Sequence, residues 1–205
     1  KKKSSTEVWV TIGLAVFFLI FLSPIIIALF GSFREMGDTS NYLHLFHAPS
    51  LESYKTAFGK MSYFRSLKNS ILITVISVIL LLTFCSMAGY AIARLRGKLG
   101  SFLQIFFLAG MIVSAQMSII PMYKVVNQVG IGNTIAAPIA LYVTAALPFS
   151  IFLYTNFIKS GVPYSLEEAA RIDGASIPFT FVRIVIPLTK PALSSLVITQ
   201  GVPIW

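Results

Sequence analysis

The sequence predicts an all-α integral membrane protein, a polytopic bundle of helices. Of its 205 residues, 56% are hydrophobic and 11% are charged, whereas a soluble domain carries about 25% charged residues. The charges stand in short clusters between uncharged runs, and four of these runs are long enough to cross a bilayer. The net charge of +9 could indicate a nucleic-acid partner, but basic clusters separated by apolar runs favour the membrane class.

The first two uncharged runs cover residues 8–31 and 69–93. A helix needs about 20 apolar residues to cross the hydrocarbon core, so each run predicts one span. The first run is too long for a removable signal peptide and is followed by no small-residue cleavage pattern. Cys85, in the second run, is interpreted as a small buried apolar residue, without a disulfide framework or a Cys-based metal site.

The next two spans come from residues 99–123 and from a longer uncharged region, 125–158. The latter is too long for one crossing, and the sequence Gly-Ile-Gly-Asn at 130–133 is a turn signal, so the fourth span is expected to start near Thr134. Pro148 lies in the middle of this span and cannot donate a helical hydrogen bond. It is either an ordinary kink in a packed bundle or a kink that shapes a pathway.

The last uncharged run, residues 191–205, is shorter than the others. As a helix it reaches about 22 Å, which is less than the roughly 30 Å of the hydrocarbon core. We therefore expect a fifth span that is cut short, with further sequence beyond it. The chain also begins without methionine, and we expect it to be incomplete at both ends.

The distribution of Lys and Arg predicts a cytoplasmic amino terminus, because cytoplasmic segments carry the excess of basic residues. In that orientation ten basic residues are inside: Lys1, Lys2, Lys3, Arg94, Arg96, Lys98, Lys159, Arg171, Arg183 and Lys190. Six are outside: Arg34, Lys55, Lys60, Arg65, Lys68 and Lys124. The same orientation places residues 161–190 in the cytoplasm.

The four complete spans contain no ionisable carboxylate and no basic residue. Ion-coupled carriers usually keep such groups inside the bundle to bind the driving ion, so this class is disfavoured. The polar groups that remain are neutral, and they fit either a neutral, hydroxyl-rich solute or hydrogen bonding between helices. They are Ser114, Gln116, Asn127, Tyr142, Thr144, Tyr154 and Asn156.

The sequence shows no catalytic set, so we assign no catalytic, cofactor-binding or metal-binding residue. It contains no HExxH, no GxSxG and no intramembrane Asp pair, which a membrane hydrolase would need in some form. His44 and His47 are three positions apart, but no third type of ligand clusters with them. A phosphate-cradling GxxxxGK[ST] loop is also absent, so any nucleotide that drives this protein binds to another subunit.

Residues 161–190 predict two short helices joined by an elbow. Gly161 and Pro163 end the fourth span, and Ser165 stands three residues before Glu168, which is the spacing of a capping box. The first helix is expected at about 166–173, with Glu167 also favourable near its amino end. Gly174 can take the left-handed conformation that ends a helix.

The second helix of this segment is expected to start at Ser176, which can cap it, with Pro178 tolerated in its first turn. Its apolar residues, from Phe179 to Val185, give more apolar surface than a short solvated loop needs. Pro187 is expected to stop it. The turn also resembles that of a DNA-binding helix-turn-helix, but apolar spans tether it on both sides, which argues against entry into a major groove.

At this segment the chain resembles the membrane-spanning permease subunits of ATP-binding-cassette importers. Their signature is Glu-Ala-Ala, then three residues and Gly, then nine residues and Ile-x-Leu-Pro. Here the signature positions hold Glu168, Ala169, Ala170, Gly174, Ile184 and Pro187, with Ile186 in place of Leu. The strings EAARIDGAS and IPLTKPAL are similar to the carbohydrate branch, related to the G-type subunit of the maltose permease. So are IIPMY at 119–123, ALPF at 146–149 and PSLESY at 49–54.

The resemblance implies one permease domain over residues 1–205, with six spans of which about four and a half are present. It implies a second permease subunit, two ATPase subunits, an extracytoplasmic solute-binding protein and a bacterial or archaeal inner membrane. ATP is hydrolysed by the separate ATPase, and this chain is not itself an enzyme. The solute is expected to be a sugar or oligosaccharide. Another solute class, or an ion-coupled carrier, is the alternative.

The resemblance further implies that residues 161–190 are the coupling loop that docks in a cleft of the ATPase. Glu168 would pair with a basic group there, and Gly174 would set the elbow. Ala169, Ala170, Asp173, Ile184 and Pro187 complete the expected coupling set. Closure of the ATPase dimer would then move the permeases as rigid bodies between inward- and outward-facing states. No solute-contacting residue is assigned.

Overall fold

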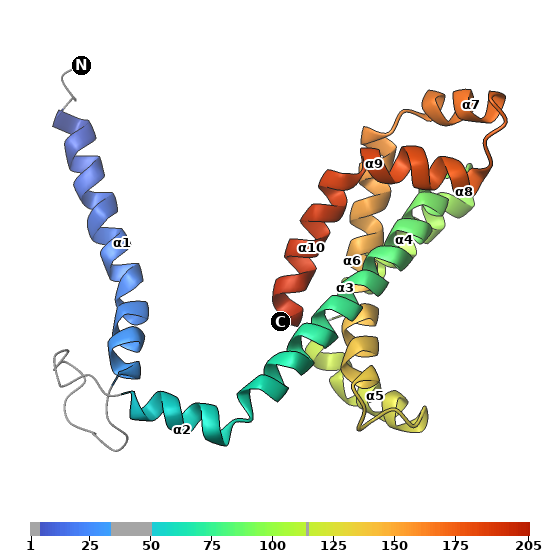
Figure 1. Ribbon diagram of the computed structural model, residues 1–205. Helices are drawn as coiled ribbons and strands as arrows, with labels where there is room; N and C mark the ends of the chain where they lie inside the picture. The colour runs from blue at the N-terminus through green and yellow to red at the C-terminus, as the bar shows by residue number, and fades with distance from the viewer. Residues whose placement is uncertain (1–4, 34–50, 114) are drawn as a thin grey trace. The chain divides into compact units, whose positions relative to one another are not determined.

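A computed structural model describes residues 5–33, 51–113 and 115–205, and every regular element in these ranges is helical (Figure 1). His44 and His47 lie outside the described residues. The chain forms two compact units, Lys1–Ser66 and Leu67–Trp205, which are described separately. In the described ranges three helices are long and apolar enough to cross a membrane, and a bent pair of helices could form a fourth span. The prediction of an all-helical membrane protein is confirmed.

The amino-terminal unit contains α1 (Ser5–Ser32) and α2 (Glu52–Lys60). α1 covers the predicted span at 8–31, and its Trp9–Ser32 part is the first candidate crossing. Within the unit the apolar side chains of α1 are largely exposed, which suits a helix that faces lipid or other helices. α2 is attached beside the end of α1, since the Tyr54 hydroxyl donates to Ser32 Oγ at 2.6 Å.

The core of the carboxy-terminal unit lies among α3 (Tyr63–Arg94), α6 (Ala136–Gly161) and α10 (Lys190–Ile204). α3 and α6 approach closely at Gly89, where an added Cβ would lie 2.9 Å from the Tyr154 ring and 3.3 Å from the backbone nitrogen of Thr155. Only glycine permits this approach without a shift. The buried core side chains are Cys85, Tyr90, Ile92, Ile151, Tyr154, Ile158, Val162, Val185, Ala192 and Leu196. Burial of Cys85 among them agrees with its interpretation as an apolar core residue.

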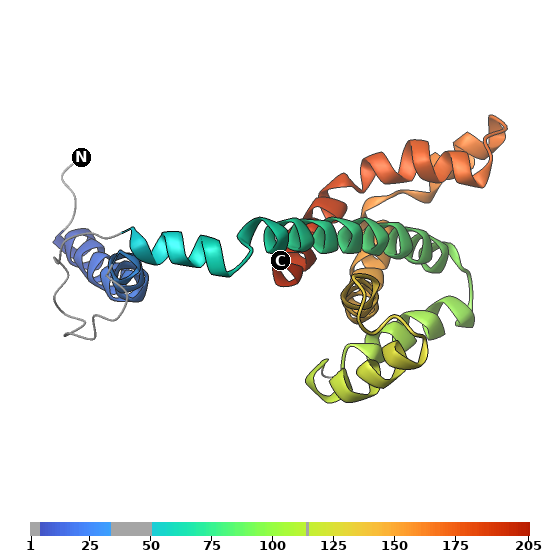
Figure 2. The ribbon, with the colours of Figure 1, turned by 60° about the horizontal axis from the view of Figure 1, so that its bottom comes forward.

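The prediction that residues 99–123 form a single membrane-spanning helix is wrong. Residues 99–123 fall into α4 (Lys98–Gly110) and α5 (Ala115–Gln128), and α4 alone is too short to cross. α4 ends at Gly110, a poor helix former, which packs beside the Pro148 ring of α6. The hydrogen bond from Gln104 Nε2 to Asn156 Oδ1, 2.9 Å long, also joins α4 to α6. Figure 2 shows α4 and α5 on the opposite side of α3 from α7 and α8.

The predicted turn before α6 is confirmed. Gly130 has a φ of +82°, and α6 begins at Ala136, two residues after the predicted start. Pro148 lies inside α6, which continues on both sides of it. α6 ends at Gly161, as predicted, and Val162 before Pro163 is extended, which is the conformation that a following proline favours.

Beyond α6 the chain forms α7 (Tyr164–Ile172), α8 (Ile177–Thr180), the π turn η1 (Phe181–Val185) and α9 (Ile186–Leu188). Figure 1 shows these elements at the end of the unit where α6 finishes and α10 starts. The helix from Ile177 to Leu188 is continuous, and it meets α10 at an angle of 71°. The bend lies at Thr189, between two prolines.

The second helix ends at Leu188, one residue after Pro187, which was the predicted stop, so Pro187 itself lies within the helix. In a regular α-helix the proline ring would clash with the carbonyl one turn earlier. Here the preceding turn is wider, since the Ile186 N–H donates to the carbonyl of Phe181, five residues back. This π turn gives the ring room, and single π turns of this kind are common at functional sites.

Candidate functional site

The elbow between α7 and α8 is built around Gly174, whose φ is +84°. The Gly174 N–H donates to the Arg171 carbonyl at 3.0 Å, and the Ala175 N–H donates to the Ala170 carbonyl at 2.9 Å. These two bonds form a Schellman motif, which satisfies the last carbonyls of a helix and requires a left-handed residue. The predicted left-handed role of Gly174 is therefore confirmed.

The predicted caps of the two helices differ from those observed. α7 begins at Tyr164, two residues earlier than expected, so Ser165 lies inside the helix and the prediction that it caps α7 is wrong. Pro163 occupies the capping position instead, with the non-helical φ and ψ of −59° and 131° that are typical of a residue just before a helix, and it makes no side-chain capping bond. Ser176 precedes α8 as predicted, with Pro178 in the first turn, but its side chain makes no capping bond to any described residue.

Four residues of the expected coupling set line one groove at the elbow. They are Ala170, Asp173, Gly174 and Ile184, and the groove has a volume of about 580 Å³. Its remaining lining residues are Ala175, Ser176 and Phe179. The groove is thus formed by both arms of the elbow, with the small residues of α7 on one wall and apolar residues of α8 and η1 on the other.

The other three residues of the set lie outside this groove. Glu168 and Ala169 are exposed on α7, and Pro187 is exposed on α9. Around the elbow the large apolar side chains of Ile172, Ile177, Phe179 and Val182 are also exposed, Ile172 by 86%. Contiguous exposed apolar residues indicate a protein–protein or membrane contact surface.

Glu167, which was predicted only to be favourable near the amino end of its helix, is fully buried against the end of α3. Its Oε1 lies 2.5 Å from Arg94 Nη2 and accepts from Arg94 Nε at 2.8 Å. Its Oε2 accepts from the Tyr90 hydroxyl at 2.9 Å. Arg94 Nη2 also donates to the Val162 carbonyl at 3.0 Å. Both carboxylate oxygens therefore have partners, which a buried charge requires.

The side chains of Tyr164 and Tyr90 both contact this ion pair. The guanidinium groups of Arg94, Arg96 and Arg171 lie 5.6, 5.4 and 5.9 Å from the centre of the Tyr164 ring, within the range of cation–π attraction. The Tyr90 ring lies 5.0 Å from the Phe181 ring of the π turn. Tyr90 therefore contacts α7 through its hydroxyl and η1 through its ring.

Tyr90 and Arg94 were not among the predicted site residues, because they are 77 and 73 positions from Glu167 in the sequence. One feature of the sequence could have indicated these partners. Tyr90 and Arg94 are four residues apart, and so lie on one helix face, at the end of an otherwise apolar run. Arg94 was counted only as one of the basic residues that set the orientation.

Among the neutral polar side chains of the spans that the structure describes, those of Tyr154 and Asn156 bind to other parts of the protein. The Tyr154 hydroxyl pairs with Thr189 Oγ1 at 2.7 Å, and Asn156 pairs with Gln104. Asn127 Nδ2 donates to the Tyr123 carbonyl within α5. Ser114 lies outside the described residues, as does the side chain of Gln116. For Tyr154 and Asn156, helix-to-helix bonding is the observed role.

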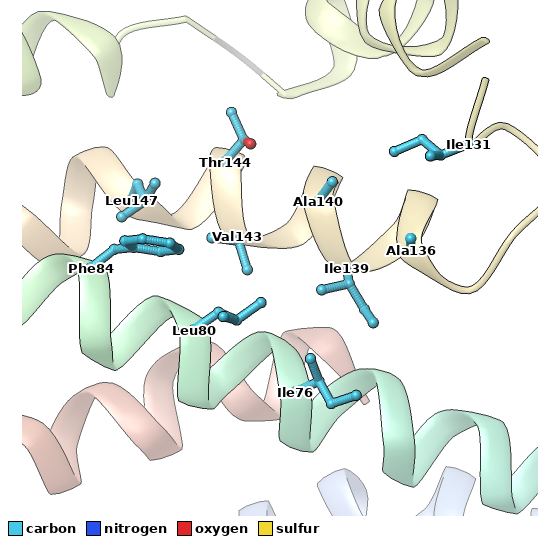
Figure 3. A pocket seen from close by; sticks show the side chains of 10 residues that line it. All are labelled: Ile76, Leu80, Phe84, Ile131, Ala136, Ile139, Ala140, Val143, Thr144 and Leu147. Carbon is cyan, nitrogen blue, oxygen red and sulfur yellow. The ribbon is translucent and has the colours of Figure 1, made fainter. Parts of the chain in front are cut away.

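Thr144 lines a second groove, between α3 and α6, with a volume of about 590 Å³ (Figure 3). Its other lining residues are apolar: Ile76, Leu80, Phe84, Ile131, Ala136, Ile139, Ala140, Val143 and Leu147. Figure 3 shows Val143 and Ile139 of α6 pointing toward α3, whereas Thr144 and Ala140 point away from it. Tyr142 is exposed outside this groove.

Comparison with known proteins gives one family and several relatives. Residues 85–205 match the family described as the inner membrane component of binding-protein-dependent transport systems. The chain is 34% identical to the multiple sugar-binding transport system permease protein MsmG of Streptococcus mutans, over all of this chain and 74% of that protein. It is 36% identical to the melibiose/raffinose/stachyose import permease protein MelC of Bacillus subtilis, over 89% of this chain and 66% of that protein.

The fold is also similar to that of a solved structure. The crystal structure of a bacterial ABC transporter involved in the import of the acidic polysaccharide alginate matches with a TM-score of 0.84 and 25% identity. The match covers all of this chain and 74% of the matched chain. This chain therefore spans about three quarters of the length of that structure.

Proposed function

This chain belongs to the family of inner membrane components of binding-protein-dependent transport systems, and we propose that it is a permease subunit that imports a sugar or oligosaccharide. The observation that carries the proposal is the 34–36% identity to permeases named for sugar transport, over nearly the whole chain. The membrane-length helices of the described residues fit a multi-pass inner membrane protein.

We propose that the elbow is the surface on which an ATPase subunit docks. Three features support this: the groove lined by both arms, the exposed large apolar side chains of the two arms, and the exposed position of Glu168 on α7. Small residues such as Ala169 and Ala170 allow close approach of a partner. In this proposal Glu168 pairs with a basic group of the ATPase, and ATP hydrolysis takes place in that separate subunit.

The complete importer in this proposal has a second permease, two ATPase subunits and an extracytoplasmic solute-binding protein. Residues 1–205 belong to one permease domain. The amino terminus lies in the cytoplasm, on the same side as the elbow, because the basic residues concentrate there. Coupling in such an assembly is reciprocal for binding: a solute that shifts the permease between states must also shift the affinity of the ATPase for nucleotide.

The test is uptake by the complete importer in proteoliposomes with internal ATP. The sugars offered are labelled melibiose, raffinose and stachyose, with an alginate oligosaccharide as the acidic alternative that the alginate transporter suggests. We expect ATP-dependent accumulation of at least one neutral sugar. Accumulation of the alginate fragment alone would replace the neutral-sugar assignment by an acidic one. Uptake that continues without the ATPase subunit would overturn the proposal itself.

A further inference from the structure

We propose that Tyr90, Arg94 and Glu167 form a clamp that makes α7 move together with α3. The inference rests on the proposed function, because it concerns how the docking elbow is joined to the bundle. It assigns a positioning role to three residues that the coupling signature does not include. The clamp is distinct from the ATPase contact that we assign to Glu168.

The first argument is that α7 is attached to the rest of its unit through few side chains. Within α7, all of which the structure describes, Glu167 is the only buried residue. Leu166 and Glu168, on either side of it, are exposed. Successive helical residues differ in direction by about 100°, so Glu167 points into the bundle while Glu168 remains available to a partner. A displacement of α7 therefore acts on the bundle through the buried Glu167 side chain, and through the Tyr164 ring that lies against Arg94 and Arg96.

The second argument is the geometry of the contact. Arg94 binds the carboxylate through Nε and Nη2, and the Nη2 group also holds the carbonyl of Val162, immediately after α6. Both Arg94 nitrogens contact the same carboxylate oxygen, Oε1, and charge-assisted hydrogen bonds are roughly twice as strong as neutral ones. The Tyr90 hydroxyl holds the second carboxylate oxygen. With three donors from one face of α3, Glu167 cannot turn without breaking at least one bond.

The third argument is that the same end of α3 also holds the other arm of the elbow. The Tyr90 ring packs against Phe181 of η1, so one residue of α3 contacts both arms. At the far end of the second arm, Thr189 is buried and is paired with Tyr154 of α6. The elbow is thus fixed to α3 and α6 at separate points, which makes it a rigid attachment for the bundle.

The test compares two neighbouring charge-neutralising substitutions, Glu167→Gln and Glu168→Gln, in the complete importer. Three quantities are measured: the ATPase retained on purification, ATP hydrolysis, and accumulation of the neutral sugar that wild-type vesicles take up. For Glu167→Gln we expect normal ATPase retention and continued hydrolysis, with sugar accumulated per ATP reduced about tenfold, within the usual range of coupling energies. For Glu168→Gln we expect reduced ATPase retention. In the complexes that still form, the amount of sugar accumulated per ATP hydrolysed should be that of the wild type.

A double variant, Glu167→Gln with Arg94→Gln, separates positioning from folding, since it removes both buried charges together. We expect it to restore the amount of assembled importer wherever a single variant reduces it, while sugar per ATP stays low. The clamp would be overturned if Glu167→Gln accumulated as much sugar per ATP as the wild type. It would also be overturned if the double variant recovered sugar per ATP along with the amount of assembled importer. If the wild-type importer accumulates none of the sugars, the proposed function fails first, and the clamp fails with it.

Discussion

The guanidinium of Arg94 and the carboxylate of Glu167 lie 2.5 Å apart although 73 positions separate them in the sequence. The contact joins the last residue of α3 to the first turn of α7. The carboxylate is fully buried, and the arginine side chain is 15% exposed. A buried pair costs desolvation energy, so its presence is better explained by the geometry that it imposes than by the stability that it adds.

This pair predicts a specific pattern of stability. Arg94→Met leaves the Glu167 carboxylate buried without its cation and is expected to destabilise the unit by about 3–5 kcal/mol. The double variant Arg94→Met with Glu167→Met removes both charges, and its loss should be clearly smaller than that of the single variant. Thermal unfolding of the purified complex in detergent measures both. Equal losses in the two variants would mean that the charges themselves are not coupled.

A substitution at Gly174 is expected to act through backbone strain and not through a steric clash of the new side chain. Its φ is +84°, and an added Cβ would meet nothing within 4 Å. A β-branched residue held in this region costs about 1–3 kcal/mol, so Gly174→Val is expected to distort the elbow and uncouple ATP hydrolysis from transport. Gly174→Asn is the control, because Asn tolerates the left-handed region. Normal solute-stimulated hydrolysis and uptake in Gly174→Val would rule out a fixed elbow.

Glu168 predicts a loss of docking without a loss of folding. Its side chain is exposed on α7, so Glu168→Ala removes no buried contact and is expected to change stability by less than about 0.5 kcal/mol. Membrane insertion should be normal, while co-purified ATPase and uptake both fall. Ser165→Ala, at another exposed position of α7, is the matched control and should behave as wild type. Undiminished ATPase retention in Glu168→Ala would count against the proposed contact.

A side chain larger than glycine at position 89 is expected to push α3 away from α6 and to lower the stability of the protein. An added Cβ would lie 2.9 Å from the Tyr154 ring and 3.3 Å from backbone, and overpacking of this kind costs about 1–3 kcal/mol. Gly89→Ala should therefore lower the unfolding temperature of the complex. Gly31→Ala is the control, because no atom lies within 4 Å of its added Cβ, and helical Ala is favoured over Gly by about 0.5–1 kcal/mol. Equal unfolding temperatures for the two variants would contradict the close approach at Gly89.

The amino-acid sequence alone determined the features that depend on neighbouring residues, namely the long apolar helices and the glycine turns. The apolar runs at 8–31 and 69–93 became helices because their length and hydrophobicity favour a membrane-spanning helix in any context. The elbow was predictable because a left-handed glycine ends a helix through bonds within a few residues of itself. The turn at Gly130 follows from the same conformational freedom of glycine.

The remaining features depend on contacts between distant segments. Two adjacent glutamates, Glu167 and Glu168, have the same chemistry, and only the position of Arg94 and Tyr90 at the end of α3 decides that the first is buried. The break of the third run lies beside Pro148 of α6, and the second arm passes Pro187 because a π turn precedes it. Packing between helices selects among conformations that differ little in local energy, so local sequence signals did not distinguish them.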